Sequence, residues 1–165
     1  SLLPDDIQVV SADQVSEEFH ARYDAKGKEY RYYVHHAHEH DLFRRHYTHH
    51  VRAELDIVRM KEACSHLEGE HDFTSFCSPK TDIKGTKVRT IYKAEVTKEG
   101  NDIVFIFRGS GFLYNMVRIL VGTLLEVGRN ERKPEDVKRI IEAKNRNEAG
   151  KTAPPQGLFL WEVFY

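Results

Sequence analysis

Hydrophobic residues recur along the chain at spacings that predict both helices and strands. Over residues 55–68, the apolar side chains of Ile57, Met60, Cys64 and Leu67 return every three or four positions. This spacing places them on one face of an amphipathic helix. Residues 55–68 are therefore predicted to form a helix that packs this face against a core.

Strands are predicted on both sides of this helix. Before it, residues 19–23 and 29–34 flank a glycine-containing turn and predict a strand pair. After it, residues 87–97 and 102–109 are joined by a Glu-Gly-Asn-Asp turn, which is typical of a β-hairpin. The closing run, residues 158–165, is apolar on both faces and predicts a buried strand.

The most apolar stretch, residues 112–128, predicts a second helix. Its buried stripe comprises Phe112, Met116, Ile119, Leu120 and Leu124. Tyr114, Asn115, Arg118 and Gly122 fall together on another side of the same helix. This side is where a polar site can form beside the core.

A third, shorter helix is predicted to start at Pro134. The order is then strand, helix, strand, strand, helix, strand, with one additional helix before the last strand. This order predicts an α+β fold of the ferredoxin-like βαββαβ type, an antiparallel sheet with helices on one face. Residues 1–165 are predicted to form this single domain. The fold serves enzymes, regulators and RNA-binding domains alike, so it does not decide the function.

Composition narrows the classes of protein. The chain has 165 residues, of which 40% are hydrophobic and 31% charged, as in an ordinary globular domain. No apolar run approaches the roughly 20 residues of a membrane span. The formal net charge of −1 argues against a strongly basic protein that wraps nucleic acid, but a local basic patch can still bind phosphate. The cysteines, Cys64 and Cys77, favour free thiols in the cytoplasm over a disulfide.

Arg118 is the first candidate for chemistry. It lies on the first turns of an apolar helix, where an unpaired charge costs several kcal/mol. A carboxylate or a phosphate is therefore the expected partner, and the alternative is a purely structural salt bridge or a side chain that extends its charge to solvent. Gly109, Gly111 and Gly122 nearby favour close approach by a ligand or by another backbone segment.

Two further clusters carry weaker signals. Lys80, Lys84, Lys87 and Arg89 form a basic run around Gly85 that suits contact with an RNA backbone, although a solvated loop has the same composition. Seven histidines lie close together: His35, His36, His38, His40, His46, His49 and His50. A metal-binding regulator would need ligand spacings of a known type, and none occurs, so we expect a solvated loop without metal.

Several segments together resemble one enzyme family. The segments with this resemblance are residues 3–7, 19–22, 28–32 (Lys-Glu-Tyr-Arg-Tyr), 71–76 and 89–91, followed by 111–118 (Gly-Phe-Leu-Tyr-Asn-Met-Val-Arg), 121–122, 127–128 and 152–158. They are similar, in the same order, to the TruA-type tRNA pseudouridine synthases. The family's first motif, a Gly-Arg-Thr-Asp stretch with the nucleophilic aspartate, is absent. We therefore expect the C-terminal domain of such an enzyme, inactive alone.

The resemblance implies a function and roles for particular residues. The full-length enzyme isomerises uridine to pseudouridine at positions 38–40 of the tRNA anticodon arm, without cofactor or metal. Tyr30 matches the tyrosine that stacks on uracil, and Arg118 the arginine that orients the aspartate. Leu113, Tyr114 and Asn115 are expected to contact the substrate beside them. The expected partners are tRNA, the protein's own N-terminal domain and a second copy in a homodimer; no membrane is involved. A non-catalytic RNA-binding module of the same fold is the alternative.

Overall fold

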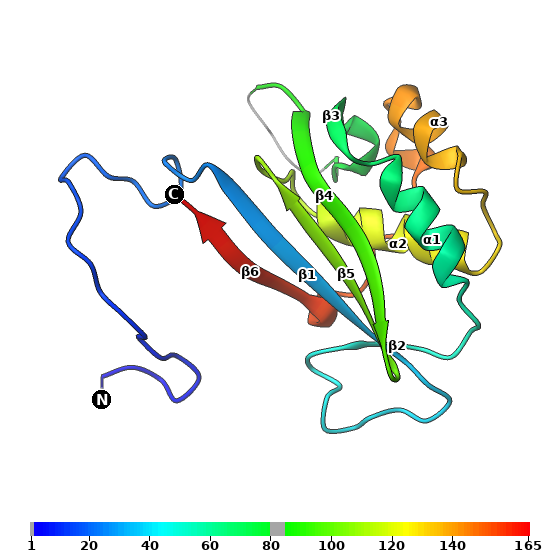
Figure 1. Ribbon diagram of the computed structural model, residues 1–165, viewed down its shortest axis with the longest axis horizontal. Helices are drawn as coiled ribbons and strands as arrows, with labels where there is room; N and C mark the ends of the chain where they lie inside the picture. Colours follow the sequence, from blue (N-terminus) through cyan, green and yellow to red (C-terminus); the bar gives the residue numbers. More distant parts are fainter. Residues whose placement is uncertain (1, 80–84) are drawn as a thin grey trace.

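The computed structural model describes residues 2–79 and 85–165 (Figure 1). The strands are β1 (Gly27–His36), β2 (His49–Val51), β3 (Gly69–Asp72), β4 (Val88–Glu99), β5 (Asp102–Gly109) and β6 (Leu158–Phe164), and the helices are α1 (Ile57–Ser65), α2 (Met116–Gly128) and α3 (Asp136–Ala143). The short turns Thr74–Phe76, Arg146–Glu148 and Pro155–Gly157 are 3-10 helices. No helix within the described residues is long and apolar enough to cross a bilayer.

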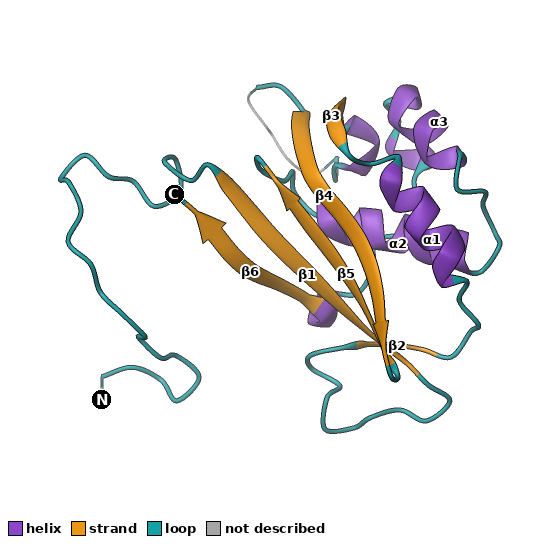
Figure 2. Cartoon of the chain, in the orientation of Figure 1, coloured by secondary structure: helices purple, strands orange, loops and turns teal. Residues whose placement is uncertain are grey.

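The strands form one sheet in the order β2-β1-β5-β4-β3. Strand β6 pairs with the first part of β1, along the same edge where the last residues of β1 pair with β2. The helices lie on one face of this sheet (Figure 2). The α+β prediction is confirmed. The sheet is mixed, however, because β1 and β2 run parallel, whereas all other pairs are antiparallel as predicted. The loop between β1 and β2 is long enough to return the chain to the same end of the sheet.

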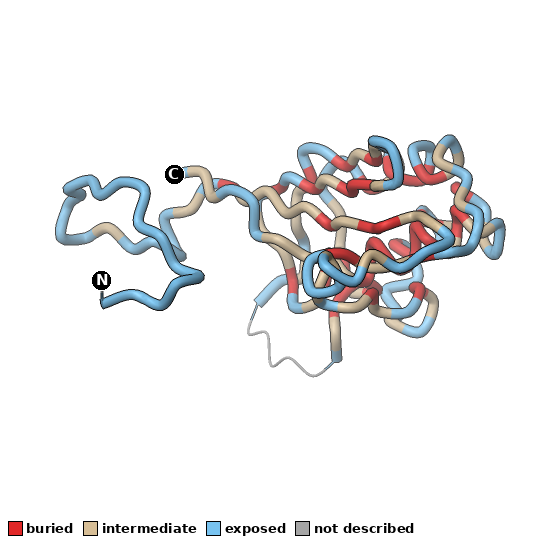
Figure 3. The backbone as a smooth tube through the Cα atoms, turned by 90° about the horizontal axis from the view of Figure 1, so that it is seen from below, coloured by how far each residue is buried: buried red, intermediate tan, exposed pale blue. Residues whose placement is uncertain are grey.

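Side chains of the central strands alternate between the two faces of the sheet. Tyr32 and Val34 of β1 are fully buried beneath the helices, as are Phe105 and Phe107 of β5. The tight turn between β4 and β5 uses Gly100 with φ of 58°, a left-handed conformation that suits glycine. The buried residues are concentrated between the sheet and the helices (Figure 3).

Two predicted strands differ from the structure. Residues 19–23 form no strand but a turn-containing segment, where the exposed N-terminal arm that extends away from the domain meets its body (Figures 1 and 3). The hydroxyl of Tyr165 donates a hydrogen bond to the carbonyl of Ala21 there. The alternation of residues 19–23 lacks a partner strand, since β1 pairs with β5, β6 and β2 instead. The closing strand β6 is correctly located but not buried: Leu160 is 53% exposed and Trp161 50%. β6 lies at the edge of the sheet, so its apolar residues are only partly covered.

Helix α2 is the buried centre of the domain. It begins at Met116 rather than at 112, and nearly all of its residues are buried. Gly122 faces the backbone of Lys151 so closely that an added Cβ would overlap the Lys151 carbonyl oxygen. Because position 122 has no side chain, the segment after α3 can lie directly against α2.

This contact predicts the effect of two substitutions in the same helix. Gly122→Ala should destabilise the protein by about 1–3 kcal/mol, since the backbone of Lys151 must move to admit the methyl group. Gly128→Ala is the matched control, because its Cβ would meet the flexible end of Met60, with the sulfur 2.8 Å away. Urea unfolding should show a clearly larger loss at position 122. Equal losses would contradict the proposed contact.

Candidate functional site

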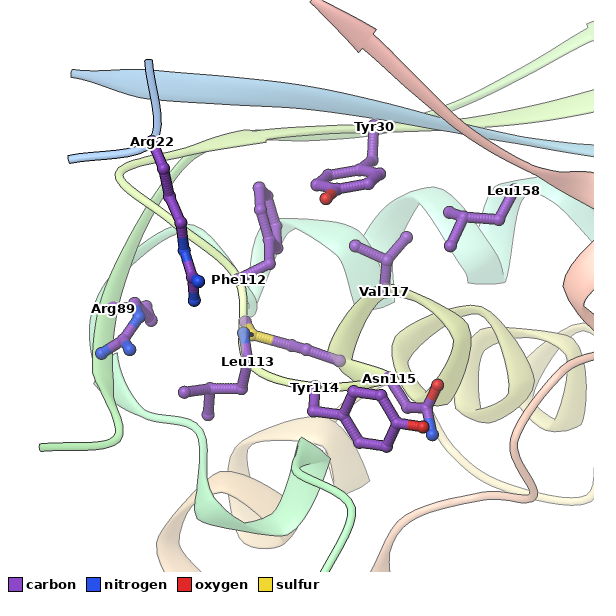
Figure 4. Close-up of a pocket in the computed structure, with 10 residues that line it drawn as sticks. Arg22, Tyr30, Arg89, Phe112, Leu113, Tyr114, Asn115, Val117 and Leu158 are labelled. Carbon is purple, nitrogen blue, oxygen red and sulfur yellow. Dashed lines mark hydrogen bonds between the residues drawn. The ribbon is translucent and has the colours of Figure 1, made fainter. Parts of the chain in front are cut away.

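A pocket of about 520 Å³ lies where the first half of β1 faces the N-terminal end of α2 (Figure 4). Its lining residues are Arg22, Tyr30, Arg89, Phe112, Leu113, Tyr114, Asn115, Met116, Val117 and Leu158. They include two arginines and no acidic residue. Arg22 and Arg89 lie on one side of the pocket and Leu158 on the other (Figure 4). The pocket thus joins an apolar wall to a positively charged one.

Tyr30 supplies an aromatic surface to this pocket. Its strand holds it on the same face as the buried Tyr32, and its ring meets the ring of Phe112 edge-on, with centroids 5.2 Å apart. Burial raises the pKa of Tyr30, so its hydroxyl is protonated at neutral pH. A partly buried, neutral phenol beside a second aromatic ring suits stacking on a planar, uncharged base.

The turn that leads into α2 brings the rest of the lining together. The backbone N–H of Met116 donates to the carbonyl of Leu113 at 3.0 Å, which closes the turn. Leu113 points inward and is buried, whereas Tyr114 is 56% exposed. Asn115 takes a left-handed conformation, with φ of 59°, immediately before the first residue of the helix. The helix predicted over 112–128 therefore begins only at Met116, and residues 113–116 form the turn that leads into it.

Arg118 lies one helical turn beyond Asn115 and does not line the pocket itself. Its Nε donates to the carbonyl of Ala153 at 2.7 Å, and its Nη1 donates to Oδ1 of Asn115 at 3.1 Å. Within the described residues, it makes no ion pair with a carboxylate, and its Nη2 makes no hydrogen bond. The structural salt bridge considered from the sequence is therefore not formed within that part of the chain.

A second hydrogen bond, from Tyr32, holds the same segment that Arg118 contacts. The hydroxyl of Tyr32 donates to the carbonyl of Pro154 at 2.7 Å, next to the Ala153 carbonyl that Arg118 binds. Burial raises the pKa of Tyr32, and the positive charge of Arg118 opposes this rise. Tyr32 and Arg118 thus both hold residues 153–154 by hydrogen bonds to their carbonyl groups. The charge of Arg118 also acts on the Tyr32 hydroxyl.

Most of the residues selected from the sequence meet at this place. Tyr30, Leu113, Tyr114 and Asn115 line the pocket, and Arg118 is joined to it through Asn115. Arg89 also lines the pocket, whereas Lys87 does not. Lys80 and Lys84 lie outside the described residues. The sequence did not select Arg22, Val117 or Leu158 as site residues, although all three occur in segments on which the resemblance rests.

Comparison with known proteins identifies the family. Residues 63–165, more than half of the chain, match the family described as tRNA pseudouridine synthase. The chain belongs to the tRNA pseudouridine synthase family. Within this family the chain is of the TruA type, so the resemblance seen in the sequence is confirmed.

The relatives of this family are similar over the whole chain. The tRNA pseudouridine synthase A of Oceanobacillus iheyensis is 52% identical over 165 residues, which is 100% of this chain and 65% of that protein. Those of Anoxybacillus flavithermus and Bacillus subtilis are 55% and 50% identical over the same 165 residues, 100% of this chain and 66% of each protein. The chain therefore spans a little under two thirds of the length of these synthases.

The histidine cluster lies at the other end of β1 from the pocket. Its centre is polar: Arg44 donates two hydrogen bonds to the carboxylate of Asp102, at 3.0 and 2.7 Å, and His35 lies 3.3 Å from the same carboxylate. The rings of His40 and His50 stack at 4.7 Å. Within residues 2–79 and 85–165, no three or more histidine, cysteine or acidic side chains gather as a metal site would require.

The Asp102 network predicts a pH-dependent contribution to stability. Burial alone would raise the pKa of Asp102, but the hydrogen bonds and charges of Arg44 and His35 outweigh it and hold the pKa below its ordinary value. Ionised Asp102 therefore stabilises the folded protein fully above the ordinary aspartate pKa of about 3.9. This stabilisation is lost as the pH falls through the lowered pKa of Asp102.

Asp102→Asn should therefore cost about 1 kcal/mol at neutral pH. The difference from the wild-type protein should shrink as the solution is acidified below the ordinary aspartate pKa. Thermal unfolding between neutral and acidic pH measures both. Glu99→Gln, at the other side of the same hairpin turn, is the control and should change little. A cost for Asp102→Asn that does not depend on pH would contradict this account.

Proposed function

We propose that the full-length protein isomerises uridine to pseudouridine in tRNA and that this chain forms one wall of the catalytic cleft. The observation that carries the proposal is the pairing of Tyr30, an aromatic surface in a pocket without acidic residues, with Arg118, an anchored cation adjoining the same pocket. The family membership of the chain supports the same reaction class.

The chemistry of the reaction agrees with a site of this composition. The bond between N1 of uracil and C1′ of the ribose breaks, and a bond between C5 and C1′ forms. The proton on C5 is lost and N1 gains one, so the product is an isomer of the substrate. No electrons are gained or lost overall, and the proposed reaction needs neither a redox cofactor nor a metal. The protein must hold a detached base, stabilise charge and move a proton.

We assign the nucleophile to an aspartate outside this chain. The relatives are longer than the region matched here, so there is room for a further segment that carries it. A carboxylate is the natural partner of Arg118, because its Nη2 and part of its Nη1 remain available for charge-assisted hydrogen bonds. Arg118 would hold the carboxylate in position and keep it ionised for attack.

The base is proposed to bind in the pocket. A uridine must leave the helical stack to reach a site of this kind. Tyr30 would stack on the detached ring, with Leu113, Tyr114 and Asn115 as further contacts, since all of them line the pocket. A ring with a protonated hydroxyl can also relay a proton in the final step.

The sugar–phosphate backbone is proposed to lie over the arginine side of the pocket. The guanidinium groups of Arg22 and Arg89 make no ion pair within the described residues, so neither is neutralised by a carboxylate there and both can bind a phosphate. Lys87, just before β4, is proposed to add to this charge, whereas Lys80 and Lys84 lie outside the described residues. This arrangement would bind RNA locally despite a formal net charge of −1.

The wider setting is also a proposal. We place the modified uridines at positions 38–40 of the anticodon arm and expect a homodimer whose protomers each contain an additional N-terminal domain, as the resemblance implies. We propose that the protein acts in the cytoplasm, where its thiols stay reduced. Cys64 and Cys77 are both buried, and burial raises the pKa of the Cys64 thiol to about 12, so this thiol is unreactive.

Tritium release from tRNA labelled at C5 of uridine tests the proposal. The full-length protein should release tritium, whereas residues 1–165 alone should release none, because they lack the nucleophile. If the full-length protein binds tRNA without release, the chain is instead part of a non-catalytic RNA-binding module. Turnover by residues 1–165 alone would show that no outside aspartate is needed.

Substitutions of Tyr30 separate its two proposed roles. Tyr30→Phe keeps the ring, so tRNA binding should be nearly unchanged, while the single-turnover rate should fall about a hundredfold without the hydroxyl. Tyr30→Leu removes the aromatic surface and should weaken binding by roughly 1–3 kcal/mol. Affinity and single-turnover product formation are measured in the full-length protein. Wild-type behaviour of both variants would show that Tyr30 serves only the core.

A further inference from the structure

The residue before helix α2 departs from the usual chemistry of a helix start. Asparagine is common at this position because its side chain accepts a hydrogen bond from an N–H of the first turn, with the backbone in the extended region. Asn115 instead has φ of 59° and ψ of 6°, and its side chain caps no helix N–H. A left-handed residue other than glycine persists only where the surroundings require it.

The side chain of Asn115 is directed to Arg118 instead. Its Oδ1 accepts a hydrogen bond from Nη1 of Arg118 at 3.1 Å. The second anchor of the same guanidinium is the carbonyl of Ala153, which Nε reaches at 2.7 Å. These anchors come from different segments of the chain, one before the helix and one 35 residues after Arg118. Because a guanidinium is planar and rigid, hydrogen bonds at two of its nitrogens fix the orientation of the third.

We infer that Asn115 is a positioning residue, which orients the Arg118 guanidinium so that Nη2 faces the carboxylate partner. This inference rests on the proposed function. It gives Asn115 a role beyond the substrate contact expected from the sequence, because its acceptor oxygen is already used by Arg118. The left-handed backbone at Asn115 is what carries the amide back over the first turn of the helix.

Asn115→Gly in the full-length protein tests the inference. Glycine adopts φ of 59° without strain, so the turn is kept and only the amide is lost. The single-turnover rate at saturating tRNA should fall about tenfold to a hundredfold, as expected for a misplaced catalytic group. The Kd for tRNA should change far less, because Tyr30, Leu113 and Tyr114 still line the pocket, and the melting temperature should stay unchanged. Asn130→Gly is the matched control: Asn130 has φ of 61° just beyond the other end of α2, and its rate should remain that of the wild type.

A double-mutant cycle with Arg118→Lys shows whether Asn115 acts through the arginine. Lysine cannot keep the two-point geometry, so Asn115→Gly should add no further loss in that background. An unchanged rate in Asn115→Gly, a weakened Kd with an unchanged rate, an unfolded variant, or losses that multiply in the double variant would each overturn the inference. The proposed function fails separately, if the wild-type protein forms no pseudouridine.

Discussion

The domain depends on the attachment of one backbone segment to helix α2. Gly122 leaves room for the chain at Lys151, and two side chains that follow Gly122 in the helix hold that chain by hydrogen bonds. Thr123 accepts from the N–H of Gly150 at 2.9 Å, and Glu126 from that of Lys151 at 3.1 Å. These contacts satisfy backbone groups that would otherwise lose hydrogen bonds on burial.

The same attachment determines where the candidate site forms. The N–H of Ala153 donates to the backbone carbonyl of Arg118, and the Arg118 side chain returns a hydrogen bond to the carbonyl of Ala153. The segment then enters β6, whose first residue, Leu158, reaches the pocket. A helix, a loop and an edge strand are thus fixed relative to one another before any substrate binds. Such preorganisation reduces the cost of ordering charged groups during a reaction.

The sequence predicted the elements better than it predicted their contacts. Periodicity located the core of α2 because Met116, Ile119 and Leu120 are buried by packing that repeats with the helix. It could not show that the chain reverses at Asn115, since a left-handed asparagine leaves no periodic signal. It also led to a wrong strand at residues 19–23, because a strand needs a partner that alternation alone does not supply.

At the candidate site, the sequence predicted the residues but not the partners of Arg118. The resemblance selected Tyr30 and the turn into α2, and the structure places these residues around one pocket. A charged partner was expected for Arg118 on physical grounds, but a backbone carbonyl and an amide hold it within the described residues. Carbonyl partners from distant segments have no sequence signature, so this arrangement could be found only from coordinates.

The exposed side of β6 affects how the chain behaves in solution. Within the described residues β6 pairs only with β1, so its other edge presents unpaired backbone N–H and C=O groups. Beside that edge are Leu160 and Trp161, both about half exposed. An apolar open edge is a template on which a strand from another molecule can add. The chain is therefore vulnerable to strand-by-strand aggregation, and a segment or partner that covers β6 should keep it monodisperse at higher concentration.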